Sequence, residues 1–150
     1  MAEGNGDGLE ITRVFDATRE RVWREFTEPE ALADWFGGAD AEVPLDSVSM
    51  DVRPGGTWKL KMFFGAARVE SNWEGEYTEV EPPERLAFTI TDTADNPERD
   101  LCTVVLTELD GGRTQMRFSQ TGGSMPPEAY ERAKQGWGKF FDQMDEHLKT

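Results

Sequence analysis

Cysteine and histidine are almost missing from this sequence of 150 residues, which contains one of each, Cys102 and His147. A lone cysteine cannot form an internal disulfide, so the composition fits a protein of the reducing cytoplasm. The chain also lacks the clustered cysteine and histidine ligands that form a zinc site. We therefore expect neither a bound metal nor another cofactor.

Acidic residues are the remaining candidates for metal ligands. The densest acidic stretch contains Asp92, Asp95, Glu98 and Asp100, but their order does not follow the ligand spacing of a calcium loop. We interpret this stretch as a solvated acidic loop.

Basic residues are scarce as well, since 16 lysines and arginines stand against 30 aspartates and glutamates, for a formal net charge of −14 at pH 7. This balance argues against nucleic acid, whose phosphates need a basic patch, and against anionic membrane surfaces. No apolar run approaches the roughly 18 residues of a membrane-spanning helix. An acidic surface also occurs in salt-rich environments, but high solubility or a genome bias are simpler explanations, and we favour them.

Residues 1–8 are glycine-rich and acidic, and they lack the basic start and apolar stretch of a signal peptide. We interpret them as a disordered lead-in to one domain over residues 9–150, a length sufficient for its own core. We expect the protein to be cytoplasmic.

The sequence shows no marked catalytic constellation. His147 is the only side chain that titrates near neutral pH when unperturbed, and its place near the end of a helix suggests an interaction with the helix dipole. Cys102 falls in an ordinary strand pattern, and no Gly-x-Ser-x-Gly motif is present. The patterns therefore do not favour an enzyme.

The strongest pattern lies near the C-terminus, where apolar residues recur at spacings of three and four. The spacing predicts an amphipathic helix over residues 127–148, with these residues on one stripe: Tyr130, Ala133, Trp137, Phe140, Phe141, Met144 and Leu148. Thr18 is the predicted N-cap of a helix that reaches residue 27. Pro29 suits the first turn of a second short helix, which Gly37 and Gly38 end.

Alternating apolar and polar residues predict an antiparallel meander. A first strand is predicted at residues 9–15, and further strands at residues 48–52, 58–62, 69–78, 86–90, 102–106 and 114–118. Turn signals at residues 54–56 and 110–112 separate neighbouring strands. Residues 39–47 read as a polar loop.

Four stretches of this chain resemble one known family. They are Val22-Trp23 to Trp35-Phe36, Asp51 to Trp58, Gly75 to Thr89, and Gly136-Trp137 with the aromatic residues after it. Together they resemble the family of homologues of the activator of the heat-shock protein 90 ATPase, within the START-like SRPBCC superfamily. The resemblance implies an α+β helix-grip fold, in which a curved sheet of about six to seven strands wraps around the C-terminal helix. Two short helices would follow the first strand, and a cavity would lie between sheet and helix.

Aromatic side chains are the candidate ligand-binding residues. Any single one fills the core most simply, but wide rings against a curved sheet leave gaps that form an apolar pocket. The predicted lining residues are Trp35, Phe36, Trp58, Trp73, Tyr77, Phe88, Phe118, Trp137 and Phe141. Ser71 shares a strand face with Trp73 and Tyr77, and its hydroxyl requires a partner when buried.

Two glycines interrupt the long helix beside Trp137. Gly136 and Gly138 each cost about 1 kcal/mol of helix stability relative to alanine, which suggests a local requirement. We consider equally a glycine that shapes the cavity and one that lets the helix approach the sheet closely.

The sequence favours a protein that binds a small apolar or amphipathic molecule in an internal cavity. The alternative is a co-chaperone or another protein-binding module, which the family resemblance also implies. A cyclase or lyase reaction in the cavity is a third possibility, for which no acid–base pair stands out. Fold alone does not choose among them.

Overall fold

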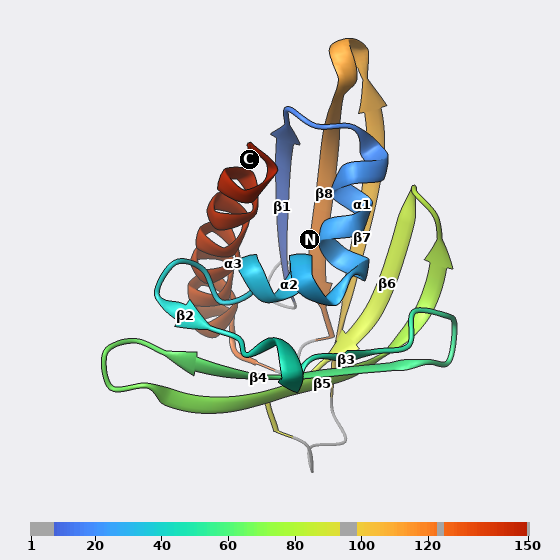
Figure 1. The fold of residues 1–150 in the computed structure, drawn as a ribbon. Coiled ribbons are helices and arrows are strands. Elements are labelled where there is room, and N and C mark those ends of the chain that lie inside the picture. Colours follow the sequence, from blue (N-terminus) through green and yellow to red (C-terminus); the bar gives the residue numbers. More distant parts are fainter. Residues whose placement is uncertain (1–7, 94–98, 123–124, 150) are drawn as a thin grey trace.

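The computed structural model describes residues 8–93, 99–122 and 125–149. It has an open antiparallel sheet with one long and two short helices packed against it (Figure 1). The helices are α1 (Arg19–Thr27), α2 (Pro29–Trp35) and α3 (Pro127–Leu148), with 3₁₀ turns η1 (Leu45–Ser47) and η2 (Asp110–Gly112). The strands are β1 (Gly8–Phe15), β2 (Ala41–Glu42), β3 (Ser49–Met50), β4 (Thr57–Phe64), β5 (Val69–Glu81), β6 (Arg85–Ile90), β7 (Asp100–Leu109) and β8 (Arg113–Thr121).

The strand order confirms the predicted meander. Within the described residues the sheet runs β1-β8-β7-β6-β5-β4-β2, with β3 also paired to β4, and every pairing is antiparallel. Two details correct the sequence prediction. The predicted loop 39–47 contains β2 and η1, and the predicted strand 48–52 is reduced to the two residues of β3. Residues 1–7 of the predicted lead-in lie outside the described residues, while Gly8 already belongs to β1.

Strand β5 gives the sheet its bend. Its first half pairs with β4, its last residues pair with β6, and the register shifts between Tyr77 and Glu79. Such a β-bulge bends a strand and increases its twist. Figure 1 accordingly shows β4 and β5 as an arm turned away from the other strands. The bend creates a concave face that α3 covers only in part.

Local signals explain the two short helices. Thr18 caps α1 by accepting a hydrogen bond from the backbone N–H of Arg21 at 3.3 Å, and Pro29 occupies the first turn of α2. The chain leaves α2 through Gly37 and Gly38, whose φ angles of +92° and +82° are those that glycine adopts readily. These predicted boundaries are confirmed.

Helix α3 faces the sheet as its apolar stripe predicts. Trp137 is buried, whereas its neighbour Lys139 is exposed. The ring of Trp137 lies 4.5 Å from that of Phe118 on β8 and stacks on Phe141 at 5.7 Å between centroids. Phe118 and Phe141 are completely buried and contact each other, so the centre of the core lies between α3 and the inward side chains of β8.

None of the helices in the described part of the chain has both the length and the apolarity that crossing a membrane requires.

Candidate functional site

A partly open pocket of about 270 Å³ lies between the first half of α3 and the ends of strands β5 to β8. We call it the mouth pocket. Part of its lining is aromatic, with Trp73, Trp137 and Phe140, and another part is polar; we call these parts the aromatic and the polar wall. The lining residues are Trp73, Ile90, Thr91, Asp92, Asp100, Gln120, Met125, Ala133, Gly136, Trp137 and Phe140.

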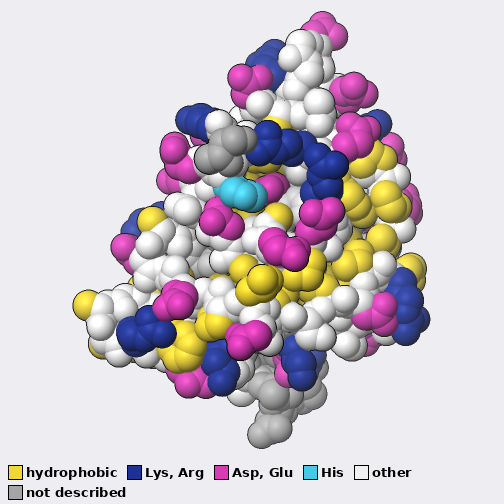
Figure 2. All heavy atoms as spheres, viewed as in Figure 1, with side chains coloured by type: hydrophobic (Ala, Val, Ile, Leu, Met, Phe, Trp, Pro, Cys, Tyr) yellow, Lys and Arg dark blue, Asp and Glu magenta, His cyan; other side chains and the backbone are white. Residues whose placement is uncertain are grey.

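A second, much smaller space, also partly open, lies between the short helices and strands β3 to β6, and we call it the inner cavity. This inner cavity measures about 20 Å³, room for about one water molecule. Its lining residues are Phe26, Leu32, Trp35, Phe36, Met50, Trp58, Tyr77, Leu86, Phe88 and Trp137. Figure 2 shows apolar side chains gathered over the same region, between α1–α2 and the bent arm of the sheet, with charged side chains around them.

Trp137 lines both spaces and therefore stands between them. Its indole Nε1–H donates a hydrogen bond of 2.8 Å to Oε1 of Gln120, which sets the ring's direction. Edge-on contact with Phe36 at 6.0 Å and with Phe140 at 5.1 Å holds it from the helix side.

A buried polar network continues from Gln120. Its Nε2–H donates to Oδ2 of Asp100 at 2.9 Å, and the hydroxyl of Tyr130 donates to the same oxygen at 2.7 Å. Asp100 is only 2% exposed, so assigning it to a solvated acidic loop was wrong. Asp95 and Glu98 of that stretch lie outside the described residues, and Asp92 is exposed.

Strand periodicity could have revealed this network. Asp100 precedes Cys102 by two residues and shares its buried face on β7, and Gln120 follows Phe118 in the same way on β8. In both strands the inward alternation simply continues one step beyond the last apolar residue. Burial and the nearby Asp100 carboxylate raise the pKa of the Cys102 thiol, which therefore stays protonated.

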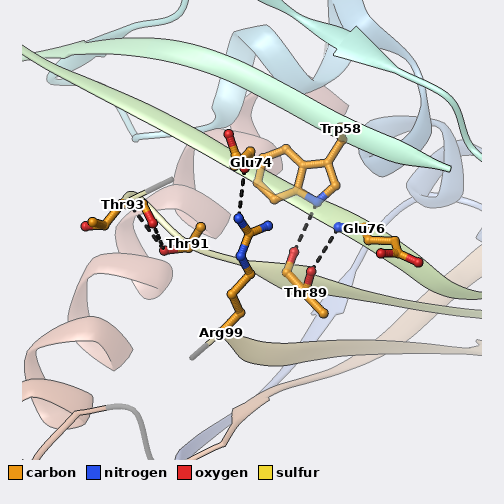
Figure 3. Close-up of polar contacts among 7 residues, drawn as sticks. All are labelled: Trp58, Glu74, Glu76, Thr89, Thr91, Thr93 and Arg99. Atoms are coloured by element: carbon orange, nitrogen blue, oxygen red, sulfur yellow. Dashed lines mark hydrogen bonds and ion pairs between the residues drawn. The ribbon is translucent and has the colours of Figure 1, made fainter. Parts of the chain in front are cut away.

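Trp58 owes its position to a glycine on the neighbouring strand. Its Nε1–H donates to the carbonyl of Thr89 at 3.2 Å across β5 (Figure 3). A Cβ on Gly75 would lie 2.5 Å from that nitrogen and 1.7 Å from the carbonyl oxygen, so no larger residue fits there.

The predicted aromatic residues divide into four groups. Trp35, Phe36, Trp58, Tyr77 and Phe88 line the inner cavity, Trp73 lines the mouth pocket, and Trp137 lines both. Phe118 and Phe141 line neither of these two spaces and instead support Trp137 from behind. The structure thus divides most of the set between two spaces that share Trp137 and does not gather it around one large cavity.

The two inward hydroxyls on β5 differ. Ser71 accepts a hydrogen bond from Trp73 Nε1 at 2.9 Å. Tyr77 is 2% exposed, and its hydroxyl has no hydrogen-bond partner among the described residues. Burial and the charge of Asp51 raise the pKa of Tyr77, so it remains a neutral phenol.

The glycines of α3 do not bring the helix closer to the sheet. A Cβ at Gly136 would meet nothing within 4 Å, and one at Gly138 would approach only Arg13 Nη2 at 3.9 Å. Close approach as the reason for these residues is therefore wrong. Gly136 instead borders both the mouth pocket and a surface groove of about 540 Å³ on the other side of Phe140.

A second buried acid lies away from both spaces. Glu25 on α1 is 3% exposed, and its Oε1 lies 2.7 Å from Nδ1 of His147 in the last turn of α3. His147 thus contacts a buried carboxylate, which an interaction with the helix dipole alone did not predict. The sequence pattern that could have predicted the burial of Glu25 is its spacing from Val22 and Phe26, which places it on the buried face of α1.

No group of three or more His, Cys, Asp or Glu side chains within residues 8–93, 99–122 and 125–149 is arranged to hold a metal ion.

Comparison with known proteins gives one family. The family described as Activator of Hsp90 ATPase homolog 1-like protein matches residues 16–149. No curated protein matches the chain at a significant level.

Solved structures share the fold over almost the whole chain. Protein CV1439 from Chromobacterium violaceum is 26% identical, with a TM-score of 0.82 over 96% of this chain and 99% of that chain. Protein NE0264 from Nitrosomonas europaea is 22% identical, with a TM-score of 0.80 over 98% and 96%. The AHSA1 (SPO3351) protein from Silicibacter pomeroyi is 21% identical, with a TM-score of 0.81 over 95% and 97%. These similarities agree with the helix-grip fold, and the match over residues 16–149 shows that the chain belongs to the family of Activator of Hsp90 ATPase homolog 1-like proteins.

Proposed function

We propose that this protein binds a small apolar or amphipathic molecule in the mouth pocket, with its apolar body against Trp73, Trp137 and Phe140. The observation that carries the proposal is a pocket of about 270 Å³ with one aromatic and one polar wall. Its size lies close to the lower end of small-molecule sites, which are commonly about 300–1,000 Å³. A cytoplasmic location and one domain over residues 9–150 belong to the same proposal.

The inner cavity extends this site if Trp137 moves. At about 20 Å³ it takes no more than about one water, but it is separated from the mouth pocket by the indole of Trp137. The hydroxyl of Tyr77, which lines the inner cavity, would then offer a hydrogen-bond partner to a polar group of the ligand. The small inner volume also means that the mouth pocket, not the inner cavity, is the primary site.

A protein-binding role is the second candidate. Phe64 and Val69 face each other across the β4–β5 hairpin and are 47% and 62% exposed. Large apolar side chains paired at an exposed tip are a feature of contact surfaces. The family description, which refers to an activator of the Hsp90 ATPase, is consistent with this role. A Phe64→Ser, Val69→Ser double variant would lose partner binding while keeping small-molecule binding.

Native mass spectrometry of the purified protein tests the primary proposal first. A retained non-protein mass would identify a ligand directly. Titration with cationic, neutral and anionic amphiphiles, followed by tryptophan fluorescence, is expected to change the emission for at least one class, because Trp73 and Trp137 line the pocket.

A Gly136→Leu variant tests the location of binding. A leucine here extends into the mouth pocket, where a Cβ meets nothing within 4 Å, so binding should weaken while the fold persists. Gly138→Leu is the matched control, with the same gain of helix propensity in the same helix but outside the pocket. Equal binding by both variants and the parent, or a fluorescence response to no member of the panel, would contradict the proposal.

A further inference from the structure

We infer that the mouth pocket selects ligands whose polar end donates hydrogen bonds, ideally an ammonium group, and rejects carboxylates, phosphates and sulfates. The inference rests on the proposed function and adds the chemical class of the ligand. Its basis is a count of donors and acceptors on the polar wall, together with the charge of that wall.

The side-chain donors of the pocket are engaged within the protein, except one hydrogen of Gln120 Nε2, which donates its other hydrogen to Asp100. Trp73 Nε1–H donates to Ser71, and Trp137 Nε1–H donates to Gln120. The hydroxyl of Thr91 donates to the carbonyl of Thr93 at 3.1 Å (Figure 3). An indole N–H or a hydroxyl has one hydrogen to give, so these three lining side chains have no further donor for a ligand.

The acceptors of the same wall retain capacity. A carboxylate offers about four lone-pair sites, so Asp92, which accepts a hydrogen bond from the Thr93 hydroxyl at 3.2 Å, can accept more. Gln120 accepts from Trp137 through Oε1, and a carbonyl oxygen has two lone pairs. A ligand that brings donors finds several acceptors on this wall, whereas an acceptor-only ligand finds one side-chain donor, the second hydrogen of Gln120 Nε2.

The charge of the polar wall also disfavours an anionic ligand. Two carboxyl side chains, Asp92 and Asp100, line the pocket, and no lysine or arginine is among its described lining residues. The nearby cation, Arg99, is held by Glu74 at 2.9 Å and does not line the pocket (Figure 3). An anionic ligand would be desolvated beside carboxyl groups without a counter-charge on the lining, which is unfavourable.

The aromatic wall also favours a cation. The faces of tryptophan and phenylalanine attract ammonium groups through the ring quadrupole, most strongly when the site excludes water. Trp73, Trp137 and Phe140 line the same pocket as the acceptor oxygens, and Trp137 donates to one of them. An amine with a flat apolar body therefore satisfies both walls at once.

Three probes with one apolar body and different polar ends test the inference: naphthylethylamine, naphthylethanol and naphthylacetate. Isothermal titration calorimetry at physiological salt would measure each dissociation constant. The amine is expected to bind at least about tenfold more tightly than the carboxylate, with the alcohol between them. Physiological salt limits general attraction of amines to the acidic surface.

Variants separate the pocket from that general attraction. Asp92→Asn is expected to weaken amine binding by about two- to fivefold, the effect of one exposed charge, and to leave the alcohol almost unchanged. Asp110→Asn, in the β7–β8 turn far from the pocket, removes the same charge and should change neither the amine affinity nor the alcohol affinity. Gly136→Leu should weaken the binding of the amine and the alcohol alike.

Failure of the ligand class and failure of the proposed function would give different results. Carboxylate binding as tight as amine binding, with both sensitive to Gly136→Leu, would overturn the ligand class and leave the proposed function standing. Equal loss of amine affinity in Asp92→Asn and Asp110→Asn would also overturn it, because the attraction would then belong to the whole surface. Binding of none of the three probes would count against both proposals.

Discussion

At the scale of single residues, burial rather than composition decides what each polar or small residue does. Asp92 and Asp100 belong to one acidic stretch, yet one is exposed and the other is 2% exposed and hydrogen-bonded to Gln120 and Tyr130. The sequence contains the alternation that identifies Asp100 as inward, but composition alone groups it with its neighbours. The partners that make its burial tolerable lie 20 and 30 positions away, and no local pattern predicts them.

Gly75 and Gly136 differ in the space around them, and this difference gives the first prediction. Gly75→Ala should destabilise the fold by about 1–3 kcal/mol or more, because its Cβ would lie 1.7 Å from the Thr89 carbonyl oxygen and displace Trp58. Gly136→Ala should instead stabilise it by about 0.5–1 kcal/mol, since the methyl group meets open space in a helix. Urea denaturation of both variants measures the two changes, and a stable Gly75→Ala protein would contradict the crossing of Trp58 over this glycine.

At the scale of elements, the sequence predicted what depends on periodicity and local capping. The apolar stripe predicted α3 over residues 127–148, and Thr18, Pro29 and the Gly37-Gly38 pair predicted the ends of the short helices. The bend of β5 was not predicted, because the bulge between Tyr77 and Glu79 depends on the pairing of β5 with both β4 and β6. No local sequence pattern contains that pairing. Trp73 and Tyr77 both precede the bulge on β5, yet Trp73 lines the mouth pocket and Tyr77 the inner cavity, a division that strand alternation alone does not predict.

The contact between α1 and α3 gives a prediction for pH. Burial, opposed in part by the hydrogen bond and charge of His147, raises the pKa of Glu25 above its ordinary value of 4.5. Arg21 also lowers this pKa and Asp34 raises it. Burial has the largest effect, and the net shift of the Glu25 pKa is upward. The folded protein thus holds this proton more tightly than the unfolded chain. The contribution of Glu25 to stability is therefore present at low pH and lost as pH rises through the raised pKa.

A Glu25→Gln variant isolates that contribution, because its side chain does not titrate. The free energy of unfolding of the parent minus that of the variant should fall as pH rises from about 4 to 7, measured by urea denaturation at each pH. Glu20→Gln, an exposed position on the same helix, controls for the loss of one acidic residue. A difference that grows with pH would show that His147 stabilises the ionised carboxylate more than burial destabilises it.

At the scale of the whole molecule, charge and shape act together. The bent sheet packs against a helix with a buried aromatic stripe, and a partly open pocket of about 270 Å³ that Asp92 and Asp100 help to line remains between them. The family resemblance predicted the enclosing architecture correctly. It did not predict that the larger space would lie at the mouth, since side-chain packing around Trp137 decides that, and many sequences with the same fold pack differently there.

The net charge of −14 gives the last prediction, which concerns salt. Like charges over one surface repel, and this repulsion is stronger in the compact state than in the expanded chain. Exposed ion pairs such as Arg53–Asp51 and Arg117–Glu10 offset little of it, because each contributes only about 0–1 kcal/mol and is itself screened. Raising the salt concentration from about 0.01 to 0.15 M shortens the screening length from about 30 to 8 Å. The melting temperature should therefore rise over this range in sodium chloride, measured by differential scanning calorimetry. A falling melting temperature would mean that the ion pairs outweigh the repulsion, and the acidic surface would then be locally compensated.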